Sequence, residues 1–284
     1  MRSKIQISKL TKLLVSLLIF WELDWHFDFL AKLAYNWYRN KGEVLMQFVA
    51  DLHIHTISSG HAYSTVLEIA QAAAEKELLM IALTDHGPAM PGAPHHYHFS
   101  NLVALPGFIY GVRVLKGIEA NILDSRGTLD LSERILAKLD IVLAGLHSVC
   151  VPSGTAEENT DMMIAAMKNP WVDVIVHPGN PEFIIDDRKV VQAAAEYDVA
   201  LEINNSSLTV SRSGSLPRCY HLLNLAKEYG CKIVLGTDSH FAFSVGDFTA
   251  AEKLISQTGL LPQQLLNTSV TKIEEHLRRR NNRR

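Results

Sequence analysis

From Phe48 onward the sequence alternates short apolar runs, rich in Val, Ile and Leu, with longer amphipathic segments. This alternation constrains the fold most, because nearly continuous apolar strands separated by helices are typical of a parallel sheet covered by helices. We predict seven strands, at Val49–His55, Leu79–Thr84, Val112–Glu119, Ile141–Leu146, Val172–His177, Ala200–Asn204 and Lys232–Gly236. We predict helices at about Thr65–Lys76, Asp161–Lys168, Lys189–Glu196, Arg218–Tyr229 and Asp247–Gln257. Such a sheet is either open or closed into a barrel.

Ionisable residues stand at the ends of nearly all of these strands. In chain order they are Asp51, His53, His55 and, after a turn, His61; then Asp85 and His86; Glu119; His147; His177; and Asp238 and His240. Side chains alternate faces along a strand, so His53 and His55 share one face, as do Asp238 and His240. A closed barrel brings the C-terminal ends of all its strands to one mouth, whereas an open sheet spreads them along a line. We therefore favour the barrel.

Nine of these residues are candidate metal ligands: His53, His55, His61, His86, Glu119, His147, His177, Asp238 and His240. A single catalytic zinc takes three protein ligands and a water, so the set predicts two or three metal ions. Nitrogen-rich ligation without thiolate suits zinc, manganese or iron, and argues against calcium or magnesium. Among the nine, Glu119 is the candidate bridge between two metals, because a carboxylate has two oxygens and an imidazole only one free nitrogen.

Other polar residues near these motifs have weaker assignments. Asp51 would share the inward face with His53 and could orient an imidazole, although a strand-end hydrogen bond fits equally well, and Asp85 is similarly open. The run from His95 to His98 follows no strand and is either a substrate-facing loop or an exposed one. We expect His26, His221 and His276 on helix surfaces and Cys150 to be inert.

Charge and cysteine content set the expected partners and compartment. The chain has 27 Lys and Arg against 30 Asp and Glu, a net charge of −3, which gives no indication of nucleic acid or of an anionic membrane as a partner. Its three cysteines are an odd number without a CxxC pair, so a reducing compartment, the cytoplasm, is expected. Self-association is left open.

The first 45 residues differ from the rest of the chain. A basic start precedes the apolar run Leu13–Trp21, which is shorter than the roughly 20 residues that a bilayer span needs. Glu22, Leu23 and Asp24 follow where a signal peptide would carry small residues. We predict a helical or peripheral extension over 1–45 and a working domain over 46–284. The alternative is a helix that caps the bottom of the barrel or anchors it at a membrane.

Several motifs, in order, resemble the PHP (polymerase and histidinol phosphatase) family of metal-dependent phosphoesterases. They include Asp51-Leu52-His53-Ile54-His55, Thr84-Asp85-His86-Gly87, Gly117-Ile118-Glu119-Ala120-Asn121, His177-Pro178-Gly179-Asn180, Leu201-Glu202-Ile203-Asn204 and Gly236-Thr237-Asp238-Ser239-His240. The resemblance, strongest to the stand-alone YcdX-type phosphatases, runs from about Met46 to Asn267. It implies a distorted (β/α)7 TIM-like barrel in which the nine residues above form a trinuclear site, with zinc expected.

The pattern and the resemblance together predict a phosphatase that hydrolyses small phosphomonoesters with a metal-activated hydroxide. Arg212 could contact the phosphate, although an ordinary surface cation is an equal alternative, and His95 or His96 could gate access. One competing reading is a metal-dependent amidohydrolase, which usually carries a carbamylated lysine where Glu119 stands here. The other is a non-catalytic PHP interaction module, in which loss of ligands would be expected.

Overall fold

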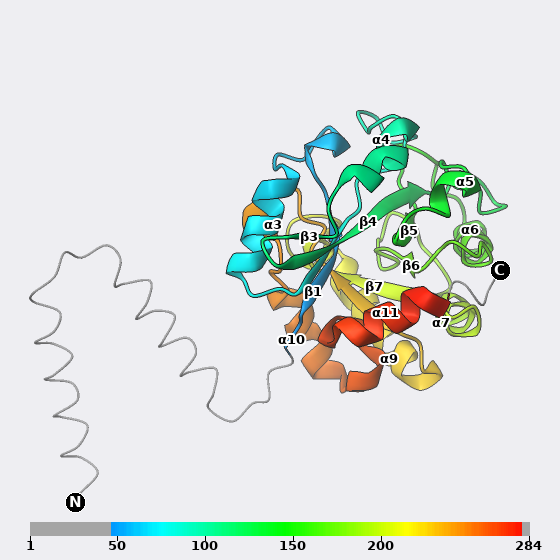
Figure 1. Cartoon of the computed structure of the whole chain (residues 1–284). Helices are drawn as coiled ribbons and strands as arrows, with labels where there is room; N and C mark the ends of the chain where they lie inside the picture. Colours follow the sequence, from blue (N-terminus) through cyan, green and yellow to red (C-terminus); the bar gives the residue numbers. More distant parts are fainter. Residues whose placement is uncertain (1–46, 280–284) are drawn as a thin grey trace, which may run out of the picture. The chain divides into compact units, whose positions relative to one another are not determined.

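The computed structural model describes residues 47–279, so the predicted extension at 1–45 and His26 lie outside the described residues (Figure 1). Seven parallel strands form the sheet in the order β1-β2-β4-β5-β6-β7-β8, and a short β3 pairs antiparallel with β4. Their bounds are β1 Ala50–Ile54, β2 Met80–Leu83, β3 Phe108–Ile109, β4 Val112–Asn121, β5 Ile141–Gly145, β6 Val174–Ile175, β7 Ala200–Asn204 and β8 Ile233–Gly236. All seven predicted strands are present, and β6 is shorter than expected.

The first and last strands lie side by side and nearly close the sheet into a barrel. Ile54 forms a parallel bridge with Ser239. The amide of Asp238 donates to the carbonyl of His53 and the amide of His55 donates to that of Ser239, both at 2.9 Å. The predicted seven-stranded barrel is therefore confirmed, and the junction between its two ends passes directly through residues of the candidate site.

Below that junction, the buried side chain of Asn267 joins the same two strands. Its amide nitrogen donates to the carbonyls of Ala50 at 2.8 Å and Leu235 at 2.9 Å, and its amide oxygen accepts from the Leu235 amide at 2.7 Å. The Asn267 carbonyl also accepts from the amide of Val49 at 2.8 Å. A single amide side chain thus supplies the hydrogen bonds that β1 and β8 lack between themselves at this level.

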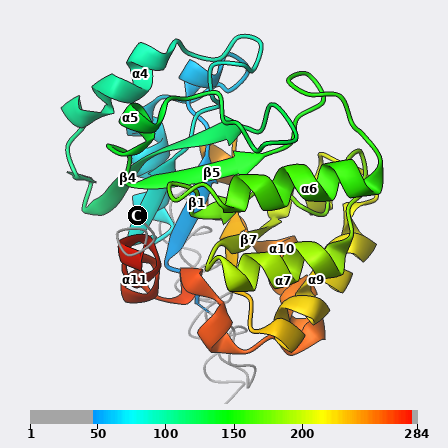
Figure 2. The same cartoon turned by 90° about the vertical axis from the view of Figure 1, so that its right-hand side faces the viewer.

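Helices alternate with the strands and cover the outside of the barrel. Their bounds are α3 Val66–Glu75, α4 His96–Asn101, α5 Glu133–Leu136, α6 Ala156–Met167, α7 Asp187–Glu196, α8 Asn205–Thr209, α9 Ser215–Tyr229, α10 Thr249–Thr258 and α11 Val270–Arg279. Figure 2 shows α6 and α7 running next to each other on one side of the sheet, with α9 beside α7. No helix within residues 47–279 is both long and apolar enough to cross a membrane.

Helix starts were predicted too late in three places, by two residues at α7, which begins at Asp187, and by more at α6 and α9. Helix α6 begins at Ala156 rather than Asp161, because Thr155 and Glu158 form a reciprocal capping box that fixes the first turn. Helix α9 begins at Ser215, three residues before Arg218. Four further helices were not predicted, namely α4, α5, α8 and α11.

An apolar core fills the barrel, and α11 covers its lower end. Inward-facing residues such as Leu52, Met80 and Leu143 form one buried cluster with Ile273 of α11 (Figure 1). His276 of the same helix is 2 % exposed, and its Nε2 lies 2.9 Å from the carbonyl oxygen of Asp173. The expectation that His276 lies on a helix surface was wrong, because α11 turns this face toward the strand ends.

Two strands break the alternation of faces just before the candidate site. On β2, β4, β5 and β8, inward core residues and the site residues on or just after the strand keep the same parity, as do Leu143 of β5 and His147 beyond its end. On β1, Leu52 belongs to the interior core, and a register shift between Asp51 and Ile54 then turns His53 inward as well. On β6, Val176 is in the core and His177 adopts a left-handed φ of 36°. These two distortions bring three more imidazoles to the mouth.

Replacing Asn267 with Ala should lower the free energy of unfolding by about 3 kcal/mol, because several buried backbone groups would lose their partner. Urea unfolding followed by circular dichroism measures this change. The matched control is Asn224→Ala, which removes an amide that bonds one carbonyl on the partly exposed surface of α9. Coincident unfolding curves for Asn267→Ala and the wild type would contradict this role.

Candidate metal centre

The nine residues predicted as ligands meet at the C-terminal mouth of the barrel. His53 Nε2 lies 3.1 Å from His55 Nε2, and His55 Nε2 lies 3.1 Å from Asp238 Oδ1. The His177 ring centroid is 5.0 Å from that of His147. Toward solvent, the ring of His61 stacks against those of His86 at 5.0 Å and His240 at 4.8 Å between centroids. Side chains from six strand ends therefore form one continuous cluster.

The carboxylate of Glu119 lies at the centre of this cluster and is completely buried. Its Oε1 faces His177 Nε2 at 2.8 Å and His147 Nε2 at 3.1 Å. Its Oε2 faces His86 Nδ1 at 2.6 Å and the Nε2 atoms of His53 and His55 at 3.4 Å. Each oxygen thus addresses a different set of imidazoles, which is the arrangement a bridging carboxylate requires.

A second set of residues fixes the orientation of four imidazoles through their Nδ1 atoms. Glu202 Oε1 lies 2.7 Å from His53 Nδ1, Ser59 Oγ 3.0 Å from His55 Nδ1, and Asn121 Oδ1 2.7 Å from His147 Nδ1. The Nδ1 of His240 lies 2.9 Å from the carbonyl oxygen of Asp238. An acceptor at Nδ1 places the ring proton there and leaves the Nε2 lone pair directed at the cluster.

Glu202, Ser59 and Asn121 had no role predicted from the sequence. Glu202 carried a usable signal, because a carboxylate inside an apolar strand must be paired when it is buried. Here it also accepts from the backbone amide of His177 at 2.8 Å. Gly236 lies opposite it: a Cβ there would come within 2.1 Å of Glu202 Oε1 and 2.5 Å of the His53 Cβ. The absence of a side chain at Gly236 thus leaves room for the Glu202–His53 contact.

The donor set fits divalent transition metals. His86 Nδ1 and Glu119 Oε2 are buried and make no hydrogen bond of acceptable geometry in the described structure. Two Nε2 atoms that face each other at 3.1 Å, as those of His53 and His55 do, need a proton or another cation between them. Three groups of donor atoms each lie within 4.8 Å of one another: His55, His86 and His240; His53, His55 and Asp238; and His86, Glu119 and His147.

Burial and charge set the protonation of the cluster. Burial lowers the pKa of His55 to about 3, helped by the charge of His86, and burial and the charge of Arg212 lower that of His177 to about 3. Burial opposes ionisation of Glu119 and Asp238, but the surrounding imidazoles, with Arg212 beside Asp238, hold both pKa values well below their usual range. Burial likewise disfavours the His53 imidazolium, but the carboxylates of Glu202, Glu119 and Asp238 outweigh it and raise that pKa. At neutral pH the cluster therefore offers ionised carboxylates at Glu119 and Asp238 and neutral imidazoles at His55 and His177, the forms that bind metals, whereas a metal ion must displace the proton that the carboxylates hold on His53.

Comparison with known proteins gives the family. The PHP domain model matches residues 51–177. A probable phosphatase of Thermoanaerobacter sp. strain X514 is 53% identical over 234 residues, which cover 82% of this chain and 96% of that protein. The chain belongs to the PHP family. A probable phosphatase of Caldanaerobacter subterraneus is 49% identical over 244 residues, covering 86% of this chain and 96% of the relative.

Among solved structures, a Listeria monocytogenes protein assigned as a histidinol phosphatase superposes with a TM-score of 0.51 at 16% identity. The match covers 70% of this chain and 97% of the other. At this identity the likeness concerns the fold, and it agrees with the nearly closed barrel of the PHP chain.

Arg212 of this PHP chain lies beside the cluster. Its Nη1 donates to Asp238 Oδ2 at 2.9 Å and to the hydroxyls of Ser207 and Ser211 at 3.2 Å. Arg212, Asp238 and His177 are also three of the six described non-glycine residues with a left-handed φ. Such backbone conformations are uncommon and gather at functional sites, because the surrounding structure must enforce them.

The weaker candidates are placed differently from expectation. The Asp51 carboxylate accepts from the amides of Thr237 at 3.1 Å and Gly246 at 2.9 Å, and no hydrogen bond or ion pair joins it to an imidazole of the described residues, so of the two alternatives the strand-end hydrogen bond holds. Asp85 accepts from the amide of Thr56 at 2.8 Å and the hydroxyl of Ser59 at 2.7 Å. It therefore positions the serine that holds His55.

The histidine run forms a short helix start rather than a loop. His95 caps α4, its Nδ1 accepting from the amide of Tyr97 at 3.3 Å, and both His95 and His96 are exposed. His98, to which no role was given, lies with its Nε2 3.3 Å from Asp85 Oδ2. His221 is exposed on α9, as expected. A role of His95 or His96 toward substrate remains a prediction.

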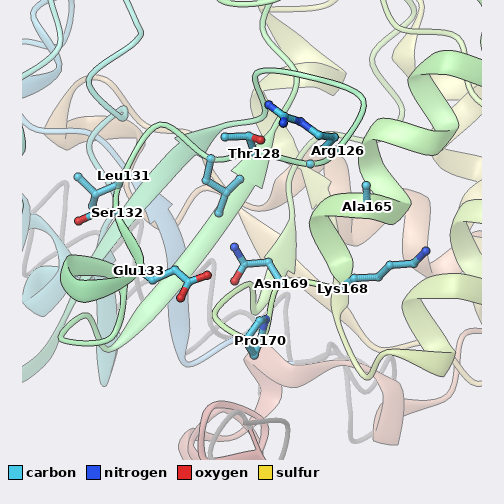
Figure 3. A pocket seen from close by; sticks show the side chains of 11 residues that line it. Arg126, Thr128, Leu131, Ser132, Glu133, Ala165, Lys168, Asn169 and Pro170 are labelled. Atoms are coloured by element: carbon cyan, nitrogen blue, oxygen red, sulfur yellow. The ribbon is translucent and has the colours of Figure 1, made fainter.

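A separate pocket of about 530 Å³ lies between the loop after β4 and the end of α6. Figure 3 shows Lys168 and Asn169 across from the loop that carries Arg126 and Thr128. None of its lining residues is among the nine predicted ligands or their Nδ1 partners. We therefore assign this pocket no role in binding metal or substrate at the cluster.

All three cysteines should react slowly in the native protein. Burial raises the pKa of Cys150 to about 11, together with the charges of Asp130 and Glu119, and burial raises those of Cys219 and Cys231 to about 12. Because the thiolate is the nucleophile, iodoacetamide at pH 7.5 should label each at least roughly tenfold more slowly than free cysteine. Mass spectrometry counts the labels, and unfolding in guanidinium should release all three. One label added at the rate of free cysteine and mapped to Cys150 by peptide digestion would show that this thiol is activated.

Proposed function

We propose that this chain is a metal-dependent phosphatase acting on small phosphomonoesters, with three metal ions held by the nine clustered residues. The proposal is carried by the imidazoles of His53, His55 and His147, whose Nδ1 atoms are fixed by other residues and whose Nε2 atoms lie within 3.4 Å of the Glu119 carboxylate. Relatives about half identical over most of the chain are named probable phosphatases, which supports the same reaction class.

The grouping of donors supports more than one ion. His55 and His86 each belong to two of the three donor groups. Three ions therefore cannot each take a complete group from these residues alone and need further donors. His61 and His177 lie outside the three groups and add two donors, and the two oxygens of Glu119 can serve two ions. Zinc is the expected metal, and manganese or iron suits the same donors. When bound, such ions acidify a water molecule and neutralise charge on a phosphate ester.

The chain itself supplies a phosphate contact in Arg212. All three hydrogen bonds that the Arg212 guanidinium donates to the described residues start from Nη1. A guanidinium has five N–H donors, so Nη2 and Nε remain to donate to two oxygens of a phosphate. The bond to Asp238 also holds the guanidinium beside the metal ligands, and its side chain is 17 % exposed, which leaves it reachable from solvent. We therefore assign Arg212 to binding of the substrate phosphate.

Purified full-length protein should contain two or more zinc, manganese or iron ions per chain and should hydrolyse 4-nitrophenyl phosphate. His53→Ala or Asp238→Ala should reduce turnover at least roughly hundredfold, since each removes a donor that no neighbour replaces. Plasma emission spectrometry, circular dichroism and phosphate release provide the measurements. His221→Ala, on the exposed surface of α9, is the matched control.

Three results would contradict the proposal. Less than one metal per chain together with activity that survives chelation would exclude a metal-dependent enzyme. Amide hydrolysis without phosphate release would favour an amidohydrolase. Bound metal without turnover of any phosphomonoester would favour a non-catalytic interaction module.

Glu202→Gln should weaken zinc binding roughly 10- to 100-fold, the range typical of partners that orient a metal-ligating histidine. Glutamine has one acceptor oxygen where glutamate has two, so it cannot accept from both His53 Nδ1 and the backbone N–H of His177. Competition with a chromophoric chelator measures the affinity, and Glu196→Gln, exposed at the end of α7, is the control. Equal affinity for wild type and Glu202→Gln would show that the carboxylate has no part in metal binding.

A further inference from the structure

The two ligands most open to solvent mark the side from which a substrate reaches the cluster. His61 is exposed and His240 is partly exposed, whereas the other seven predicted ligands are buried. Their rings stack at 4.8 Å between centroids, so they belong to one surface. A substrate that placed its phosphate at the cluster would therefore extend its remaining part past these two residues.

Three exposed aromatic residues stand directly beside them. Tyr63 is 75 % exposed, Phe241 47 % and Phe243 81 %, and each follows one of the two open ligands by one to three positions. Together they form an aromatic rim. Isolated exposed apolar residues need no explanation, but an exposed apolar group beside a site is typical of a binding surface.

The rim is held in place before any substrate binds. The amide of Tyr63 donates to the carbonyl of His240 at 2.8 Å, and the amide of Ala242 donates to Ser64 Oγ at 2.9 Å. The hydroxyls of Ser239 and Ser244 both donate to the carbonyl of Phe241, at 2.7 and 2.9 Å. The rings of Phe241 and Phe243 lie edge to face with centroids 4.9 Å apart. Preorganised aromatic groups gain contact with a ligand at little loss of entropy.

Other strand ends repeat the pattern. Ile57 follows His55 by two residues and Val149 follows His147 by two, and both side chains are exposed. The loops of β1, β5 and β8 thus each carry an exposed apolar group just beyond a predicted ligand.

We propose that the aromatic rim of Tyr63, Phe241 and Phe243 binds the alcohol part of the substrate, and that this part is an apolar, ring-bearing group. This inference rests on the proposed phosphatase function. The rim buries apolar surface when it stacks on such a group, whereas a short polyhydroxy alcohol would leave it exposed to water.

The test compares two esters that differ only in a ring, 3-phenylpropyl phosphate and propyl phosphate, on the full-length protein supplied with zinc or manganese. Their leaving alcohols have similar basicity, so a difference reports binding of the phenyl group. We expect kcat/KM to be at least roughly tenfold higher for the phenyl ester. The double variant Tyr63→Ser/Phe243→Ser should bring this ratio close to one, and both side chains are exposed enough to be replaced without disturbing the core.

Leu79→Ser is the matched control, because Leu79 is 55 % exposed but stands before β2, at the opposite end of the barrel. It should leave the ratio unchanged. Turnover of both esters with a wild-type ratio near one, or a ratio that survives in the double variant, would overturn the inference and leave the phosphatase function standing. A double variant that changes the molar mass by size exclusion but keeps the ratio would show that the rim joins copies of the chain instead. Failure to hydrolyse either ester or 4-nitrophenyl phosphate would overturn both proposals.

Discussion

The buried carboxylate of Glu119 is the interaction on which the mouth of the barrel depends. A fully buried negative charge is unfavourable unless it is paired, and here its two oxygens face imidazoles from β1, β5, β6 and the end of β2. In return, the carboxylate stabilises the proton or metal cation that the converging imidazole lone pairs need between them. The strand ends therefore hold their positions through a shared centre rather than through apolar packing, which lies one layer deeper.

A division into two layers explains how one barrel can contain both an apolar core and a polar centre. Along β4 the same inward face carries Leu115, then Gly117, then Glu119, so one inward position separates the core from the site. Gly117 and Gly236 occupy the level in between, where a Cβ would meet side chains at under 3 Å. Small residues at this level let the large groups above and below approach the barrel axis.

Much of the fold and of the centre was predictable because both depend on patterns local to the sequence. Apolar runs of the right length gave all seven parallel strands, and the ionisable residues at their ends gave the nine residues that the structure brings together. The short helices α4, α5 and α8 were missed because four to six residues do not show a helical period. Helix α11 was missed for a different reason: its buried face, with Ile273 and His276, has a partner only once the barrel exists to be covered.

The sequence by itself determined which chemical groups stand at each strand end and, through the period of two, which of them face inward on β2, β4, β5 and β8. Only the tertiary structure decided that His53 and His177 join them, because the register shift in β1 and the left-handed φ at His177 override that period. Tertiary structure also decided that Glu202 rather than Asp51 orients His53. The physical reason is the same in each case: which acceptor a buried imidazole reaches depends on how neighbouring strands are placed, and that placement is set by closure between β1 and β8, residues nearly 190 positions apart.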